Sequence, residues 1–140
     1  MTHTFTNFDK SLEELTGLIE GDPTDAPTPL VEWIRRSWKK PLSSLTDEEI
    51  GRLIVQRYGL PYILDLVWIK LQRNPLFEGS YYPGDVLSNL IRWEKENWKD
   101  RPKYEAELKS LYERAIQRPT EEKDSFLESL GLPTDGSFSN

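Results

Sequence analysis

The chain has 140 residues with 24 acidic and 18 basic side chains, so its formal net charge is −6. A chain of this length folds as one domain and buries roughly 70% of the surface that the unfolded chain exposes. The lack of cysteine excludes disulfides and thiolate metal sites. The negative charge disfavours binding to the phosphate backbone of a nucleic acid and favours a basic protein partner.

Apolar residues recur at helical rather than strand spacing, which predicts an all-α fold with a single compact domain of about six to seven helices. Proline, glycine and capping residues separate the segments. The expected helices span about 9–20, 29–39, 47–58, 61–73, 85–93, 102–118 and 121–130. We expect the helical domain to cover residues 1–132 and a frayed tail to cover residues 133–140.

Several helix boundaries follow from capping chemistry. Thr28 followed by Pro29 is typical of an N-cap and a first helical position. The third helix has the clearest start, because Thr46 and Glu49 have the spacing of a capping box. We expect Gly59 to cap the end of this helix and the next helix to begin at residue 61.

Helical spacing also predicts the core. In the first two helices the inward residues are expected to be Phe8, Leu12, Leu15, Ile19, Leu30 and Ile34. In the remaining helices they are expected to be Leu53, Ile54, Leu64, Leu71, Leu87, Leu90 and Leu111. Trp38 and Trp68 have core spacing, whereas Trp33 and Trp93 lie off the apolar stripes and are expected to be partly exposed or to contact a partner.

Residues for catalysis are scarce. The single histidine, His3, lies near the N-terminus, and no nucleophile elbow or phosphate-binding glycine loop occurs. The carboxylates Asp47, Glu48, Glu49, Asp65 and Asp85 could converge in space, but the first three fan around one helix start and form a charge cluster there more simply. The sequence thus predicts a protein that is not an enzyme and holds no metal and no cofactor.

Nucleic-acid and membrane binding are also disfavoured. A glycine separates two helices in "EEIGRLIVQRYGLPYILDLVWIK", as in a helix-turn-helix unit, but the second helix is too apolar to read bases. Its run "LPYILDLVWIKL" includes Asp65 and Lys70 and is too short to cross a bilayer. The start "MTHTFTNFDK" lacks the apolar stretch of a signal peptide, so we expect a cytoplasmic protein.

Residues 41–93 carry four ordered blocks, "PLSSLTDEE", "GLPY", "NPLFEG" and "YYPGDVL". In this order and spacing the blocks resemble the core of the immunity proteins of bacterial contact-dependent growth inhibition (CDI). Val86 departs from the leucine expected in the last block, and Trp68 and Lys70 stand where small residues are common. The surface near these positions is therefore expected to be particular to this member.

The resemblance implies a helical, non-enzymatic inhibitor that stays in the producing cell. Its partner would be the cognate toxic C-terminal domain of a large secreted effector, bound 1:1. Many such toxins are nucleases, and an acidic protein can occupy their basic substrate groove. The alternative that remains is a stand-alone helical adapter or regulatory module with another partner.

The adjacent tyrosines of "YYPGD" have two interpretations. They either pack over the helix below as scaffold, or form an aromatic platform for a partner. Acidic and aromatic residues around this loop, the linker and the helix starts are the candidates for toxin binding. They are Asp22, Asp25, Trp33, Asp47, Glu48, Glu78, Tyr81, Tyr82, Asp85 and Trp93.

Overall fold

The computed structural model describes residues 8–131 and folds this part of the chain into helices without a β-strand. The α-helices are α1 (Leu12–Thr16), α2 (Pro29–Trp38), α3 (Asp47–Val55), α4 (Tyr62–Arg73), α5 (Asp85–Ile91), α6 (Pro102–Ala115) and α7 (Thr120–Ser129). Short 3-10 helices are η1 (Pro23–Asp25), η2 (Leu42–Ser44) and η3 (Lys95–Trp98). The predicted all-α single domain is confirmed, while the predicted tail, 133–140, lies outside the described residues.

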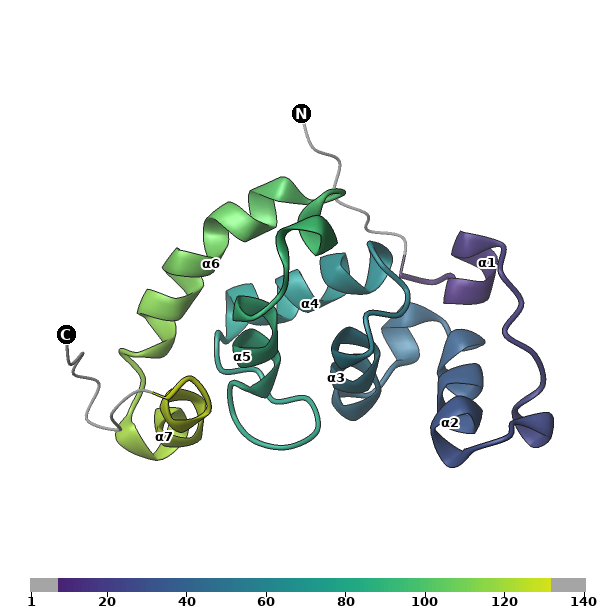
Figure 1. Ribbon diagram of the computed structural model, residues 1–140, viewed down its shortest axis with the longest axis horizontal. Helices are drawn as coiled ribbons and strands as arrows, with labels where there is room; N and C mark the ends of the chain where they lie inside the picture. The colour runs from purple at the N-terminus through teal and green to yellow at the C-terminus, as the bar shows by residue number, and fades with distance from the viewer. Residues whose placement is uncertain (1–7, 132–140) are drawn as a thin grey trace.

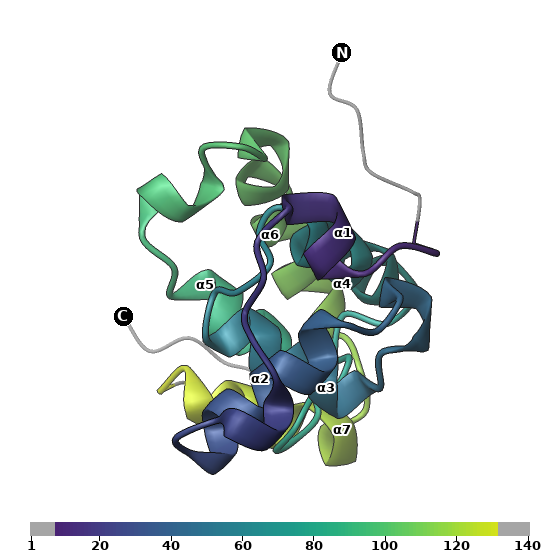
Figure 2. The same cartoon turned by 90° about the vertical axis from the view of Figure 1, so that its right-hand side faces the viewer.

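The helices form two layers. Helices α2, α3, α5 and α7 follow one another along one side of the molecule, and α4 and α6 lie along the other (Figure 1). Contacts join α3 to α4 and α5, and join α6 to α4 and α5, while α7 packs on α5. Figure 2 shows the molecule from the side where α1 and α2 lie, and the segment that connects these two helices is at the front. The loop between α4 and α5 reaches down between α5 and α3 (Figure 1).

The predicted starts of α2 and α3 are confirmed. The Glu49 N–H donates to Thr46 Oγ1 at 3.1 Å, and the Thr46 N–H donates to Glu49 Oε1 at 3.0 Å. At the start of α2, the Val31 N–H donates to Thr28 Oγ1 at 3.2 Å. These side chains satisfy N–H groups that have no partner within the helix, and so determine where α2 and α3 begin.

The first helix is shorter than predicted. A capping box of Ser11 and Glu14 starts α1 three residues late, and Gly17 ends it in the left-handed conformation, with φ 72°. Because the chain leaves the helix there, Ile19 is 79% exposed, and its predicted inward position is wrong.

Other helix boundaries also differ from the prediction by one to three residues, and three of them have identifiable local features. Helix α3 ends at Val55 with Gln56 as C-cap, so Gly59 is not its cap. Helix α4 begins at Tyr62, one residue later than expected. Helix α6 ends at Ala115, three residues short of the prediction, because its last turn opens before Pro119. Each difference lies at a helix end, where competing turns have similar energies.

The seven core residues predicted from α3 onward are confirmed, since each is at most 1% exposed. Trp38 and Trp68 are buried as predicted. Besides Ile19, two burial predictions are wrong. Trp93 is only 7% exposed, because it packs on Trp98 at 5.1 Å between ring centroids, and Leu30 is 42% exposed. Leu30 sits in the first turn of α2, where no neighbouring helix covers it completely.

Candidate functional site

The segment 75–84 between α4 and α5, which we call the tyrosine loop, is held by one carboxylate. Asp85, the first residue of α5, accepts hydrogen bonds from the N–H groups of Gly79, Ser80 and Tyr81 at 2.8–2.9 Å. These bonds satisfy three consecutive backbone donors, so the loop has a defined shape without secondary structure of its own.

The tyrosine loop lies directly against α3. A Cβ atom built on Gly51 would stand 2.7 Å from the Cα atom of Gly79, and therefore only glycine allows the helix and the loop to approach this closely. The Ser80 hydroxyl donates to the Glu48 carbonyl at 3.3 Å. The start of α3 and the tyrosine loop consequently form one continuous surface.

Helix α7 supports the tyrosine loop from behind. Gly84 has φ +87°, and a Cβ atom there would stand 2.8 Å from Phe126 Cβ and 2.9 Å from Leu76 Cδ2. Phe126 is fully buried. The Pro-Gly turn that opens α5 is thus required both by its left-handed backbone and by the packing of α7 against it.

A groove of about 440 Å³ lies between α3, the tyrosine loop and α5, with α2 at its edge. We call it the α3–α5 groove. Its walls are Leu30, Gly51, Arg52, Val55, Gln56, Ser80, Tyr81, Tyr82, Asp85, Val86, Ser88, Asn89 and Arg92. Tyr82 is half-buried and Tyr81 is 76% exposed, so the two rings have different surroundings although they are adjacent in sequence.

Ion pairs flank the groove at the start of α3. Glu48 Oε1 lies 2.8 Å from Arg52 Nη2, and Asp47 Oδ1 lies 3.1 Å from Lys70 Nζ. The Arg52 guanidinium stacks over the Trp33 ring at 4.8 Å from its centroid. The acidic helix start therefore carries less uncompensated charge than its sequence implies, although Asp47 and Glu48 remain more than half exposed.

The structure brings together most of the candidate residues predicted from the sequence. Those that line or flank the α3–α5 groove are Trp33, Asp47, Glu48, Tyr81, Tyr82 and Asp85. Glu78 is exposed on the tyrosine loop. The ring of Trp93 faces the interior, where its Nε1–H donates to Asn89 Oδ1 at 2.9 Å.

Asp22 and Asp25 lie away from the groove. Asp22 directly precedes η1 and Asp25 is its last residue, and η1 contacts α2. Hydrogen bonds from the backbone N–H and the hydroxyl of Thr24 lower the pKa of Asp22. Asp22 is the N-cap of this short turn, which gives it a local structural role.

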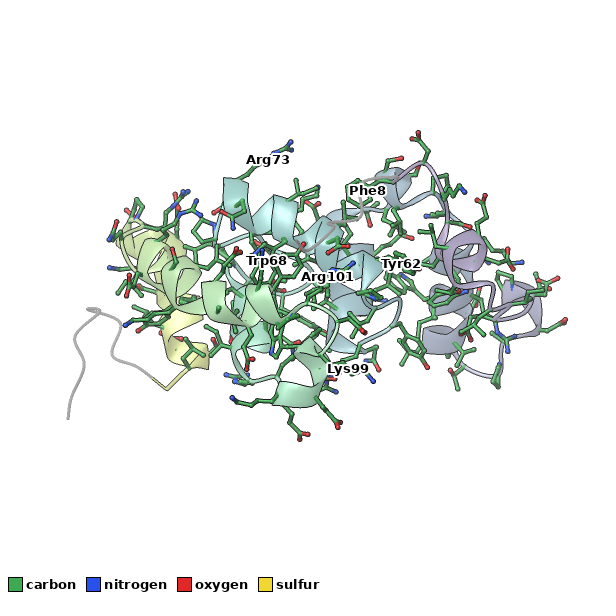
Figure 3. All side chains as sticks on the ribbon, turned by 90° about the horizontal axis from the view of Figure 1, so that it is seen from above. Phe8, Tyr62, Trp68, Arg73, Lys99 and Arg101 are labelled. Carbon is green, nitrogen blue, oxygen red and sulfur yellow. The ribbon has the colours of Figure 1, made fainter. Side chains whose placement is uncertain are left out.

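The buried carboxylate Asp65 has a structural role that the sequence analysis missed. Arg101 binds both of its oxygens at 2.8 and 2.7 Å, and the Tyr104 hydroxyl donates to Oδ1 at 2.7 Å. The Trp68 ring stacks on Tyr104 with centroids 4.2 Å apart, and Figure 3 shows Trp68 and Arg101 together where α4 and α6 meet. The bidentate pair raises the pKa of Arg101 and joins the two helices.

Glu49 is the other buried carboxylate of the predicted acidic cluster. Lys40 donates to Glu49 Oε2 at 2.8 Å, and the Ser37 hydroxyl donates to the same oxygen at 3.1 Å. Burial alone would raise the pKa of Glu49, but the hydrogen bonds from Lys40 and from the Thr46 N–H outweigh it and lower the pKa. Within residues 8–131, no three histidine, cysteine or acidic side chains are placed to hold a metal ion.

Of the groove walls, sequence reasoning identified only Tyr81, Tyr82 and Asp85, and among those it missed are Leu30, Arg52, Val55 and Arg92. A signal for one of them was present, because Glu48, Arg52 and Val55 follow one another at helical spacing on the face of α3 opposite Leu53. A valine on an otherwise charged face indicates a contact surface. Arg92 could not be found in this way, since its position depends on the packing of α5 against α3.

Comparison with known proteins agrees with the resemblance carried by residues 41–93. The profile of a family described as CDI immunity proteins matches residues 14–108, which is more than half of the chain and includes every wall of the groove. Searches of curated proteins and of solved structures found no match. None of the helices in residues 8–131 has the length and apolar character to span a membrane. The chain therefore belongs to the family of CDI immunity proteins.

Proposed function

We propose that this protein binds the toxic C-terminal domain of a CDI effector and neutralises it, 1:1 and without catalysis, in the cytoplasm of the producing bacterium. The observation that carries the proposal is the family match over residues 14–108. The α3–α5 groove supports it, because exposed apolar and aromatic side chains gathered in one concave surface are typical of protein interfaces. No observation favours the alternative of a stand-alone adapter.

We further propose that the toxin is a nuclease. A nuclease needs a basic substrate groove, and the net charge of −6 favours association with such a surface. Glu78 is exposed on the tyrosine loop and Asp47 and Glu48 are exposed beside it, where they can approach a basic cleft. Asp22 and Asp25 extend this acidic character to the far edge of α2.

Within this proposal the candidate residues have different tasks. Tyr81 offers an exposed ring with few rotatable bonds, so it supplies contact area at a low entropic cost. Tyr82 lines the groove, and Trp33 lies beneath the guanidinium of Arg52, another of its walls. Asp85 and Trp93 act indirectly, since their polar atoms bind the tyrosine loop and α5 respectively.

The test of the proposed function is titration of the toxin domain encoded beside this chain with the purified protein. Toxin activity is expected to end near an equimolar ratio, as it does for a tight stoichiometric inhibitor. Loss of toxin activity at strongly substoichiometric amounts of this protein would contradict the non-enzymatic mechanism. Failure of the wild-type chain to bind the toxin would contradict the proposed function altogether.

The electrostatic part has its own test in association kinetics at two ionic strengths. The double variant Asp47→Lys/Glu48→Lys is expected to associate more slowly and with weaker salt dependence than the wild type. The matched control is Glu121→Lys/Glu128→Lys, which makes the same charge change at exposed positions of α7. Equal effects of both double variants would show that net charge alone steers the toxin.

A further inference from the structure

The charged side chains that line the α3–α5 groove differ in sign from the chain as a whole. The protein is acidic, yet the groove contains two arginines, Arg52 and Arg92, and one acid, Asp85. The Asp85 oxygens are engaged by three N–H groups of the tyrosine loop. Arg52 is paired with Glu48. Of these three charged walls, Arg92 is thus the one whose side chain forms no hydrogen-bonded or ionic contact within residues 8–131.

Arg92 is exposed at the C-terminal end of α5 and takes part in none of the ion pairs found within residues 8–131. Its place at a helix C-terminus favours the cation, because the helix dipole is negative there. A guanidinium held beside apolar walls binds a carboxylate in a bidentate manner and more strongly than it would in open water.

The apolar lining of the groove is equally distinctive. Six large apolar or aromatic residues of the described part of the chain are exposed, and three of them, Leu30, Val55 and Tyr81, line this groove. They come from α2, α3 and the tyrosine loop, so their convergence is a product of the fold. Exposed apolar side chains gathered in a concave surface indicate a binding site for a partner.

The walls are also rigid before any partner binds. The close approach of Gly51 and Gly79 fixes the tyrosine loop on α3, and Asp85 fixes the loop on α5. A preorganised surface loses little conformational entropy on binding, and this favours a tight complex.

We propose that the α3–α5 groove receives a segment of the toxin domain that presents an apolar side chain next to a carboxylate. The apolar side chain packs between Leu30, Val55 and Tyr81, and the carboxylate pairs with Arg92. The inference rests on the proposed function and deepens it. The toxin would then be held at two places of opposite charge: a basic surface meets the acidic start of α3, and an acidic-apolar segment enters the groove.

The experiment measures the affinity of variants of this protein for the toxin domain encoded beside it. Val55→Asp places a carboxylate among the apolar walls, so binding is expected to weaken at least about 30-fold. Arg92→Glu is expected to weaken it at least about tenfold. The control is Arg73→Glu, the same charge change at an exposed arginine that points away from the body (Figure 3), with an expected change below about threefold.

Thermal unfolding of each variant checks that the fold is retained. Should Val55→Asp unfold, Tyr81→Ala replaces it, because the 76% exposed ring of Tyr81 contributes little to folding, and a loss of about tenfold or more is expected. Wild-type affinity of the folded groove variants would overturn the inference while the proposed function stands. Equal losses in Arg92→Glu and Arg73→Glu would also overturn it, since they would reflect net charge.

A charge exchange identifies the pair directly. Each surface Asp or Glu of the toxin domain is changed to Arg and tested against Arg92→Glu. At least one toxin variant is expected to restore binding to Arg92→Glu while weakening binding to the wild-type chain. If no toxin variant does so, Arg92 does not pair with a toxin carboxylate and the inference is wrong. Absence of binding between both wild-type proteins would instead refute the proposed function.

Discussion

The contact between α4 and α6 and the α3–α5 groove use the same three residue types, an aspartate, an arginine and a tyrosine, in opposite ways. Between α4 and α6, Asp65 is fully buried and its oxygens accept from Arg101 and from the Tyr104 hydroxyl. Trp68 stacks on the tyrosine and closes the network on one side. All three polar groups therefore bind one another and contribute to the fold.

At the groove, the aspartate binds backbone instead. Asp85 accepts from three N–H groups of the tyrosine loop, so Arg92 and Tyr81 are left facing solvent. The difference shows how a scaffold and an interface are told apart. Polar and aromatic groups that bind one another stabilise the protein. Groups that the fold positions without binding partners are available to another protein.

The largest effect is expected from a change in the network of Asp65, Arg101 and Tyr104. Arg101→Met leaves the Asp65 carboxylate buried without its cation, so the free energy of unfolding should fall by about 3–5 kcal/mol, measured by urea denaturation. The double variant Asp65→Leu/Arg101→Met removes both charges and should recover part of this loss. An equally unstable double variant would mean that packing, not the unpaired charge, accounts for the loss.

The second test compares the core beneath the α3–α5 groove with the core beneath the Asp65–Arg101–Tyr104 network. Leu64→Ala in α4 and Leu90→Ala in α5 should each lower the free energy of unfolding by about 2–5 kcal/mol, because both residues are at most 1% exposed. Losses below about 0.5 kcal/mol in chemical denaturation would contradict the core assignment.

A smaller effect is expected where the tyrosine loop meets α3. Gly51→Ala gains about 1 kcal/mol of helix propensity, but its methyl group would clash with the Gly79 backbone and displace the loop. The net result should be a loss of about 1–3 kcal/mol in the free energy of unfolding, together with weaker toxin binding. A variant as stable as the wild type would show that the close approach does not position the groove.

The smallest effect concerns Glu49, whose ion pair with Lys40 lies at the start of α3. The pKa of Glu49 in the folded protein is below its ordinary value of 4.5, so its stabilising contribution is present above that pH and is lost as the pH falls through the lowered pKa. Glu49→Gln should therefore cost up to about 1 kcal/mol at neutral pH.

Urea denaturation of both proteins across the acidic range provides the measurement. The stability difference between wild type and Glu49→Gln should shrink as the pH falls from 4.5 through the lowered pKa, because Glu49 is then protonated in the unfolded state and finally in the folded state as well. A difference that stays constant from neutral to acidic pH would show that Glu49 acts through its shape and not through its charge.

Much of the scaffold could be predicted because its causes are local. Capping by Thr28 and Thr46 and the spacing of apolar residues depend on neighbours within one or two turns, and these helices begin where predicted. Local signals also compete, however, as at Gly17, where a left-handed residue ends the first helix early and leaves Ile19 exposed.

The site was only partly predictable. The tyrosine loop and the acidic start of α3 were identified from residue type, and the fold places them side by side. Arg92, Val55 and Leu30 were not identified, because each is an ordinary surface residue of its own helix and becomes part of a groove only when three helices meet. The burial of Trp93 was mispredicted for the same reason, since its cover comes from Trp98.

The sequence by itself determined the all-α class, most helix starts, the apolar core from α3 onward and the family, because all four depend on residue patterns along the chain. Only the tertiary structure decided which charges neutralise one another. Asp65 lies 36 residues from Arg101 and Asp47 lies 23 from Lys70, and no local pattern encodes such contacts. The tertiary structure thus gives Asp65 a role in stabilising the fold and leaves Arg92 available to bind a partner.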